Sequence, residues 1–251
     1  IESSILKREE PIVQELANEY LTEQGITILN DVTLNSVSND GNKPVITANG
    51  QNYTFDAVLY ATGRKPNTAN IGLENTDITT NERGAIVIND TCESSVPGVY
   101  AVGDVNGGPQ FTYISLDDFR IVFGALTGNG QYTLKDRKNI PYTTFLTPPL
   151  ARVGLTEEDA INKGYTVKTK EMLVATMPRA HVNDYLKGAF KIVVNAENDL
   201  ILGATLYSQA AEELINLIKM AMDNNIPYTY FKNQIFTHPT MAENLNDLCN
   251  F

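Results

Sequence analysis

Two continuous apolar runs, each ending at a glycine, constrain the fold of this chain more than any other feature. They are residues 56–63 (DAVLYATG) and residues 98–104 (GVYAVGD). A strand with one face in water alternates apolar and polar residues, whereas an unbroken apolar run is typical of a strand covered on both faces in a parallel sheet. A terminal glycine lets the backbone approach a ligand closely. We therefore expect open α/β architecture in this part of the chain.

The elements before these runs have simpler signatures. Residues 11–24 place apolar side chains at three-to-four spacing, which predicts a helix, and Gly25 is suited to cap it. Residues 26–29 are expected to form a short strand. Residues 32–37 and 45–47, separated by the turn signal of residues 39–42, predict a β-ribbon.

The later part of the chain has a different organisation. A helix is expected over residues 112–124, and the charged link at residues 135–138 marks a boundary. Beyond it we expect strands at 143–146, 170–176, 189–194 and 201–207, a helix that starts with a capping box at 156–159, and a long helix over 210–224. The apolar stripe of that long helix could be a dimer seam or ordinary core. Both interpretations stay open on the pattern alone.

Charge and cysteine content exclude several functions. The formal charge of −11 opposes binding to nucleic acid or to an anionic membrane surface. No run of 18 or more apolar residues and no signal-peptide pattern is seen, so a cytoplasmic location is expected. Cys92 and Cys249 are too far apart for a CxxC or CxxxxC pair, which favours free thiols, and no metal site is expected. Ile1 begins in mid-pattern, so we expect a fragment of a longer chain.

Two motifs indicate a nucleotide-like ligand. Residues 61–67 (ATGRKPN) end the first apolar run at Gly63, although a plain strand-to-loop turn explains this too. Gly103 and Asp104 end the second run, where open α/β sheets bind ligands and a carboxylate can accept a hydrogen bond from a sugar or ribityl hydroxyl. A solvated loop acid is the alternative. The helix that begins near Thr112 offers free N–H groups to a partly negative ligand atom.

A third motif near the C-terminus, residues 236–243 (FTHPTMAE), indicates acid–base chemistry. Proline holds the preceding His238 on an extended backbone. Glu243 lies five residues on, within reach of one ring nitrogen, and such a partner fixes the tautomer and raises the basicity of histidine. A structural histidine is the alternative interpretation. His181 has no acid at motif spacing and is expected to be a surface or packing residue.

Together, ATGRKPN, GVYAVGD and HPTMAE resemble, in order and spacing, the pyridine nucleotide-disulfide oxidoreductase family, which includes glutathione reductase, dihydrolipoamide dehydrogenase and mercuric reductase. Residues 147–157 (TPPLARVGLTE) resemble the entry to its dimerisation domain. The resemblance implies partial Rossmann-like nucleotide-binding domains, followed by an α+β dimerisation domain with an antiparallel sheet. Residues 1–62 would end the NAD(P)-binding domain, 63–135 would return to the FAD-binding domain, and 136–251 would form the dimerisation domain.

The resemblance also assigns roles to single residues. Asp104, with Gly103, would bind the ribityl chain of FAD, and the backbone at Thr112 would lie near the flavin pyrimidine edge. Gly63 would lie near the nicotinamide nucleotide. Glu2 falls where an acid holds the adenosine ribose in NAD-preferring members, which favours NADH over NADPH.

The implied mechanism requires a homodimer. Hydride would pass from NAD(P)H to FAD, the flavin would reduce a cysteine pair, and the thiolate would attack the substrate. His238 and Glu243 match the family's dyad, which moves protons for the cysteine pair of the opposite subunit. That cysteine pair is absent from the printed sequence, so the chain alone is expected to be inactive.

The identity of the substrate is what the sequence constrains least. Residues 107–118, 177–180 and 243–248 resemble the bacterial reactive-chlorine-resistance branch, which reduces hypothiocyanous acid. A dihydrolipoamide dehydrogenase-like or mercuric reductase-like enzyme is the alternative, although a single C-terminal cysteine, Cys249, argues against mercury. Two further interpretations are a fragment that acts only as a dimerisation module, and a flavoprotein oxidase or peroxide reductase with one cysteine.

Overall fold

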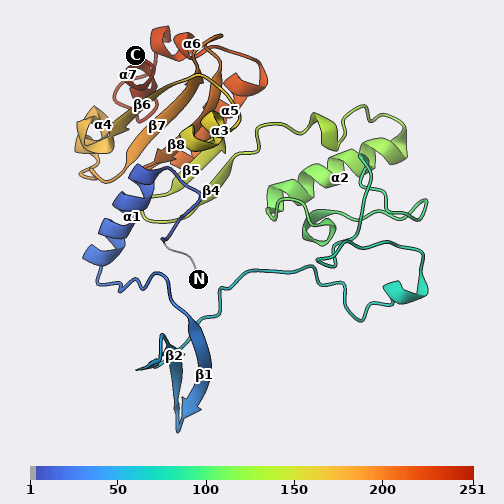
Figure 1. Cartoon of the computed structure of the whole chain (residues 1–251). Coiled ribbons are helices and arrows are strands. Elements are labelled where there is room, and N and C mark those ends of the chain that lie inside the picture. Colours follow the sequence, from blue (N-terminus) through green and yellow to red (C-terminus); the bar gives the residue numbers. More distant parts are fainter. Residues whose placement is uncertain (1–3) are drawn as a thin grey trace. The chain divides into compact units, whose positions relative to one another are not determined.

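A five-stranded antiparallel sheet organises the C-terminal part of the chain in the computed structural model, which describes residues 4–251 (Figure 1). Its strands lie in the order β4-β5-β8-β7-β6, and every adjacent pair is antiparallel. The strands are β4 (Tyr142–Thr144), β5 (Leu150–Gly154), β6 (Val167–Leu173), β7 (Ala189–Asn195) and β8 (Ile201–Tyr207). The predicted strands at 189–194 and 201–207 are confirmed, and those at 143–146 and 170–176 are confirmed with shifted bounds.

Helix α5 (Ala211–Asp223) covers one face of this sheet and settles the role of its apolar stripe. Leu214, Ile218 and Ala221 are buried against apolar residues of the sheet. The predicted long helix is confirmed, and its stripe is core rather than a free seam. Leu217, which the same stripe contained, stays 36% exposed at its border.

Helix α1 (Pro11–Glu23) contributes to the other face. Pro11 lies in the first turn, where its missing N–H costs nothing, and Gly25 follows the helix at φ 83°, as a left-handed cap does. Val13, Ala17 and Tyr20 pack against Leu150 and Tyr207 of the sheet. Covered from both sides, β7 buries all seven of its residues.

Small helices complete the same unit. They are α3 (Glu157–Asn162), α4 (Pro178–Val182), α6 (Tyr228–Asn233) and α7 (Asn244–Leu248). The predicted capping box at the start of α3 is confirmed at its N-cap, because the Thr156 hydroxyl accepts a hydrogen bond from the Asp159 amide at 3.1 Å.

A second antiparallel sheet follows α1 in sequence. It contains β1 (Leu34–Asp40), β2 (Lys43–Ala48) and β3 (Gln51–Thr54), and it confirms the predicted ribbon. The strand predicted at residues 26–29 is wrong, since these residues form no strand. They follow the cap at Gly25 as irregular backbone.

Residues 59–138 pack as a compact unit, separate from the unit that residues up to 58 form with residues 139–251. Its one long described helix is α2 (Thr112–Thr127), which confirms and extends the predicted helix at 112–124. The domain boundaries expected from the resemblance stay a prediction.

The two apolar runs do not form the parallel strands that their pattern predicts. Residues 56–63 form no strand, and Leu59 is 89% exposed. In the second run, Tyr100 makes only an isolated antiparallel bridge with Glu93. A central strand needs hydrogen-bonding neighbours on both edges. Within residues 4–251, the second run is paired only on one side, with residues 92–94, and the first run pairs with no strand.

None of the helices in residues 4–251 is long and apolar enough to cross a membrane.

Candidate functional site

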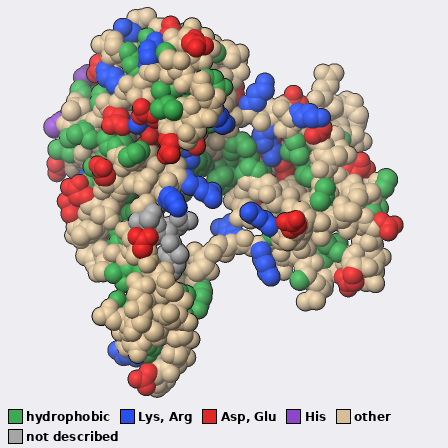
Figure 2. All heavy atoms as spheres, viewed as in Figure 1, with side chains coloured by type: hydrophobic (Ala, Val, Ile, Leu, Met, Phe, Trp, Pro, Cys, Tyr) green, Lys and Arg blue, Asp and Glu red, His purple; other side chains and the backbone are tan. Residues whose placement is uncertain are grey.

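The C-terminal motif brings together the two residues assigned to acid–base chemistry. His238 Nδ1 lies 2.7 Å from Glu243 Oε2. The imidazole is 69% exposed, whereas the carboxylate is 18% exposed. Figure 2 shows the histidine side chains at the surface of the molecule. With Nδ1 held by the carboxylate, Nε2 has no hydrogen-bond partner among the described residues.

The carboxylate of Glu243 is held from a second side. Its Oε1 accepts a hydrogen bond from the Thr240 amide at 3.0 Å, and its own amide donates to the Thr240 hydroxyl at 3.2 Å. Desolvation raises the pKa of Glu243, but the hydrogen bonds from His238 and Thr240 outweigh it and lower the pKa below its usual value. Glu243 is therefore an ionised partner that orients the imidazole.

Asp104 lies at the end of the second apolar run, in a short 3-10 turn (Gly103–Asn106). Its side chain is 49% exposed and forms an ion pair with Arg64 at 3.7 Å. Among residues 4–251, no hydrogen bond engages the Asp104 carboxylate, so its oxygens can accept bonds from a polyhydroxyl chain. The structure thus fits the ribityl-binding role, and Arg64 comes from the ATGRKPN motif.

A network that sequence reasoning missed supports this turn. The Asp118 carboxylate, on α2, accepts hydrogen bonds from the Gly103 amide at 2.7 Å and from the Asn106 side chain at 3.0 Å. Arg137 pairs with Asp118 and, at 2.6 Å, with Asp117. The signal was an acid pair within an otherwise apolar helical segment, since an acid at a buried helical position needs such partners.

Backbone conformation explains why glycine occupies position 103. Gly103 has φ 72°, and a Cβ there would lie 2.6 Å from the Ser115 hydroxyl. The glycine therefore allows the turn to sit against α2. Thr112 is the first residue of α2, and the first N–H groups of a helix lack intrahelical partners.

The remaining assigned positions lie apart from these contacts. Gly63 has φ 112°, and a Cβ at this position would meet no atom of the described residues within 4 Å, so its role rests on backbone conformation alone. Glu2 lies outside the described residues. His181 is exposed, with Nε2 2.8 Å from the Ala175 carbonyl, as expected of a surface residue.

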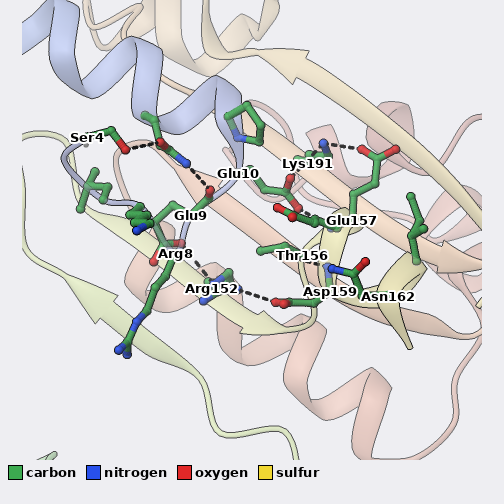
Figure 3. A pocket seen from close by; sticks show the side chains of 16 residues that line it. Ser4, Arg8, Glu9, Glu10, Arg152, Thr156, Glu157, Asp159, Asn162 and Lys191 are labelled. Carbon is green, nitrogen blue, oxygen red and sulfur yellow. Dashed lines mark hydrogen bonds and ion pairs between the residues drawn. The ribbon is translucent and has the colours of Figure 1, made fainter. Parts of the chain in front are cut away.

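A pocket of about 1070 Å³ is lined by the segment before α1, by Arg152 of β5 and Lys191 of β7, and by α3 (Figure 3). Its charges are paired internally. Lys191 Nζ lies 3.0 Å from Glu10, 2.7 Å from Glu157 and 2.9 Å from Glu171. Arg152 pairs with Glu9 at 3.1 Å. These ion pairs join the segment before α1 to the larger sheet beside the pocket.

Both cysteines are buried. Desolvation raises the pKa of Cys92 to about 11 and that of Cys249 to about 12. Since the thiolate is the nucleophile and the metal ligand, neither thiol suits redox or metal chemistry here. No group of three or more His, Cys, Asp or Glu residues within 4–251 is arranged to hold a metal ion.

Sequence comparison decides the family. The family described as "Pyridine nucleotide-disulphide oxidoreductase" matches residues 1–118, and its dimerisation domain matches residues 140–249. The chain belongs to this family. It is 42% identical over 246 residues to the "Probable pyridine nucleotide-disulfide oxidoreductase RclA" of Escherichia coli K12, an alignment that covers 98% of this chain and 56% of that protein. It is 36% identical to a mercuric reductase of Staphylococcus aureus, over 96% of this chain and 45% of that enzyme.

Structural comparison agrees. The solved structure of the "HOCl-induced flavoprotein disulfide reductase RclA from Escherichia coli" matches with a TM-score of 0.95 and 41% identity, over 99% of this chain and 57% of that one. The expected fold class is confirmed, although the two apolar runs form no strands here. The chain spans about half the length of these relatives.

Proposed function

We propose that this chain acts as the C-terminal part of an FAD-dependent NAD(P)H oxidoreductase in which His238 is the acid–base residue. The observation that carries the proposal is the 2.7 Å contact between His238 Nδ1 and an ionised Glu243, with the imidazole exposed. A histidine that only filled the surface would not require a carboxylate partner. This partner is itself held in place by a hydrogen bond from Thr240.

The residues present support the family's arrangement, in which separate residues bind FAD, lie near the nicotinamide nucleotide and exchange protons with the cysteine pair. Asp104 and Gly103, with the start of α2 at Thr112, would hold FAD, and Gly63 would lie near the nicotinamide nucleotide. FAD supplies the hydride chemistry when bound. His238 would hold a proton at Nε2 and exchange it with a thiol of the cysteine pair on the opposite subunit of a homodimer. NADH is the preferred donor in this proposal, on the sequence position of Glu2.

Hypothiocyanous acid or a related oxidant is the proposed substrate. Support comes from 42% identity to RclA, whose solved structure is described as an HOCl-induced flavoprotein disulfide reductase. Dihydrolipoamide dehydrogenase-like and mercuric reductase-like activities are the alternatives. The burial of Cys249, whose pKa is about 12, counts against a mercury ligand there. Nucleic acid and membranes are not among the proposed partners, and the proposed location is the cytoplasm.

A second candidate function is a dimerisation module without catalysis. It is favoured by the match of residues 140–249 to the dimerisation domain and by the absence of a CxxxxC pair from the printed sequence. Light scattering at micromolar concentration tests this candidate, because a monomeric chain would contradict the module.

The test of the main proposal is stopped-flow kinetics on an enzyme that joins this chain to the flavin-binding and cysteine-bearing regions of its relatives. His238→Ala should slow oxidation of the reduced enzyme by hypothiocyanite about 100-fold, the lower end for a positioned acid–base group. Flavin reduction by NADH should stay nearly unchanged, because hydride transfer from NADH to the flavin moves no thiol proton. His181→Ala, the other exposed histidine, is the matched control and should leave both halves intact. Equal loss in both halves for His238→Ala would remove the histidine from this role.

A further inference from the structure

The loop between α6 and α7 carries both members of the dyad and contains no helix or strand (Figure 1). It spans residues 234–243, and Glu243 is the N-cap residue directly before α7. A loop of this length has no regular backbone hydrogen bonds, such as those of a helix or strand, to define its shape. The position of His238 relative to Glu243 must therefore depend on what holds the two ends of the loop.

Asn246, on α7, holds the first end. Its side-chain amide donates to the carbonyl of Phe231 at 2.6 Å and to that of Gln234 at 3.0 Å, with Lys232 at 3.3 Å. The last carbonyls of a helix lack intrahelical partners. Asn246 thus caps the C-terminal end of α6 from a neighbouring helix and ties the start of the loop to α7.

Asn244 holds the second end. It is 2% exposed, and its side-chain amide donates to the carbonyls of Thr240 and Met241 at 3.2 and 3.1 Å. Thr240 is the residue whose amide and hydroxyl engage Glu243. The two asparagines therefore connect α7 to both ends of the segment that contains the dyad.

We propose that Asn244 and Asn246 are positioning residues that hold His238 and Glu243 in hydrogen-bonding register. This inference rests on the proposed function and deepens it. Neither asparagine touches substrate. Each acts by keeping α7, and with it the Glu243 carboxylate, at a set distance from the imidazole. A general acid–base group depends on such placement, since small misplacements are costly in rate.

The test substitutes Asn246→Asp, which keeps the shape of the side chain but replaces its donors with a carboxylate facing carbonyl oxygens. The readout is the nitrogen chemical shifts of His238 at neutral pH in the 251-residue chain, which report the tautomer. The unaltered chain should show a proton on Nδ1, directed at Glu243, and Asn246→Asp should lose that pattern. Asn224→Asp is the matched control, because Asn224 caps α5 through the Met220 carbonyl at 2.8 Å and should leave the pattern unchanged.

The outcomes separate the two hypotheses. If the unaltered chain lacks the Nδ1–H pattern, the dyad and the proposed function fail together. If Glu243→Gln loses the pattern and Asn246→Asp keeps it, the dyad stands and the positioning role is overturned. Should Asn246→Asp fail to fold, Asn246→Ser removes the amide without adding charge and decides the question in the same way.

Kinetics give an independent readout. In the enzyme that joins this chain to the flavin-binding and cysteine-bearing regions, Asn246→Asp should slow the oxidative half-reaction about 10-fold, part of what a positioned acid–base group contributes. In a His238→Ala background, Asn246→Asp should cause no further loss of rate, because the imidazole that Asn246 positions is absent. An additive loss in the double variant would show that Asn246 acts elsewhere.

Discussion

At the scale of single residues, the chemistry depends on which polar groups have partners. The Glu243 carboxylate contacts His238 Nδ1 and accepts a hydrogen bond from the Thr240 amide, and its pKa is lowered. The Asp104 carboxylate has only a long ion pair with Arg64 among the residues that the structure describes. The first is therefore an oriented member of a pair, whereas the second is available to a ligand.

The lowered pKa of Glu243 has a measurable consequence for stability. A carboxyl group whose pKa is lower in the folded state stabilises the fold above its unfolded pKa, near 4.5, and this contribution is lost as the pH falls through the folded value. Glu243→Gln should therefore make the urea midpoint fall less between pH 7 and acid pH than it does in the unaltered chain. Glu158→Gln, at an exposed position of α3, is the control and should not alter the slope.

At the scale of elements, close backbone contacts determine which residues the sheet accepts. Gly188 lies directly before β7 with φ 119°, and a Cβ there would lie 1.7 Å from the Tyr207 carbonyl oxygen of β8. Its amide also donates to the Tyr20 hydroxyl of α1 at 2.8 Å. Helix α1, β7 and β8 come together at this glycine and leave no room for a side chain.

Gly188→Ala should destabilise the chain by about 3 kcal/mol or more, because both the left-handed conformation and the clash with backbone are unfavourable. Gly164→Ala is the control that separates the two effects. Gly164 also has positive φ, at 85°, but no atom of the described residues lies within 4 Å of where its Cβ would be. Its cost should be about 1 kcal/mol, from conformation alone. Equal losses in urea denaturation would show that the clash at position 188 is relieved by movement.

At the scale of the whole molecule, a buried lysine joins the segment before α1 to the larger sheet. Lys191, in β7, has a side chain 6% exposed and contacts Glu10 as well as Glu157 and Glu171. Desolvation lowers the pKa of Lys191, but its three carboxylate partners raise it above the usual value. The pairing connects parts of the chain about 180 residues apart.

Lys191→Met should destabilise the chain by about 3 kcal/mol, because it leaves Glu10 buried without its cation. The contribution of Lys191 is complete below its unfolded pKa, near 10.5, and is lost as the pH rises through the higher folded value. The difference between the two proteins in urea midpoint should therefore shrink at strongly alkaline pH. Lys168→Met, on β6, removes a half-buried cation whose pair with Asp199 is more exposed than that of Lys191, and should change the midpoint less. An equal effect of both substitutions contradicts the role of burial.

Local patterns in the sequence were sufficient to predict elements that are stabilised mainly by interactions within the element. The helix at residues 11–24, the ribbon around the turn at 39–42 and the strands at 189–194 and 201–207 were all predicted from periodicity and turn chemistry. The proximity of His238 and Glu243 was predictable too, because Glu243 lies five positions after His238 and a proline directly follows the histidine.

Tertiary packing decided the rest. The runs at 56–63 and 98–104 have the composition of central strands but remain irregular, because a strand is stable only with neighbours that pair its backbone. Asp118 with Arg137, and Glu10 with Lys191, could not be paired from sequence, since nothing local relates residues 19 or 181 positions apart. Periodicity describes the surface that one segment presents, whereas a buried charge is specified by the distant segment that neutralises it.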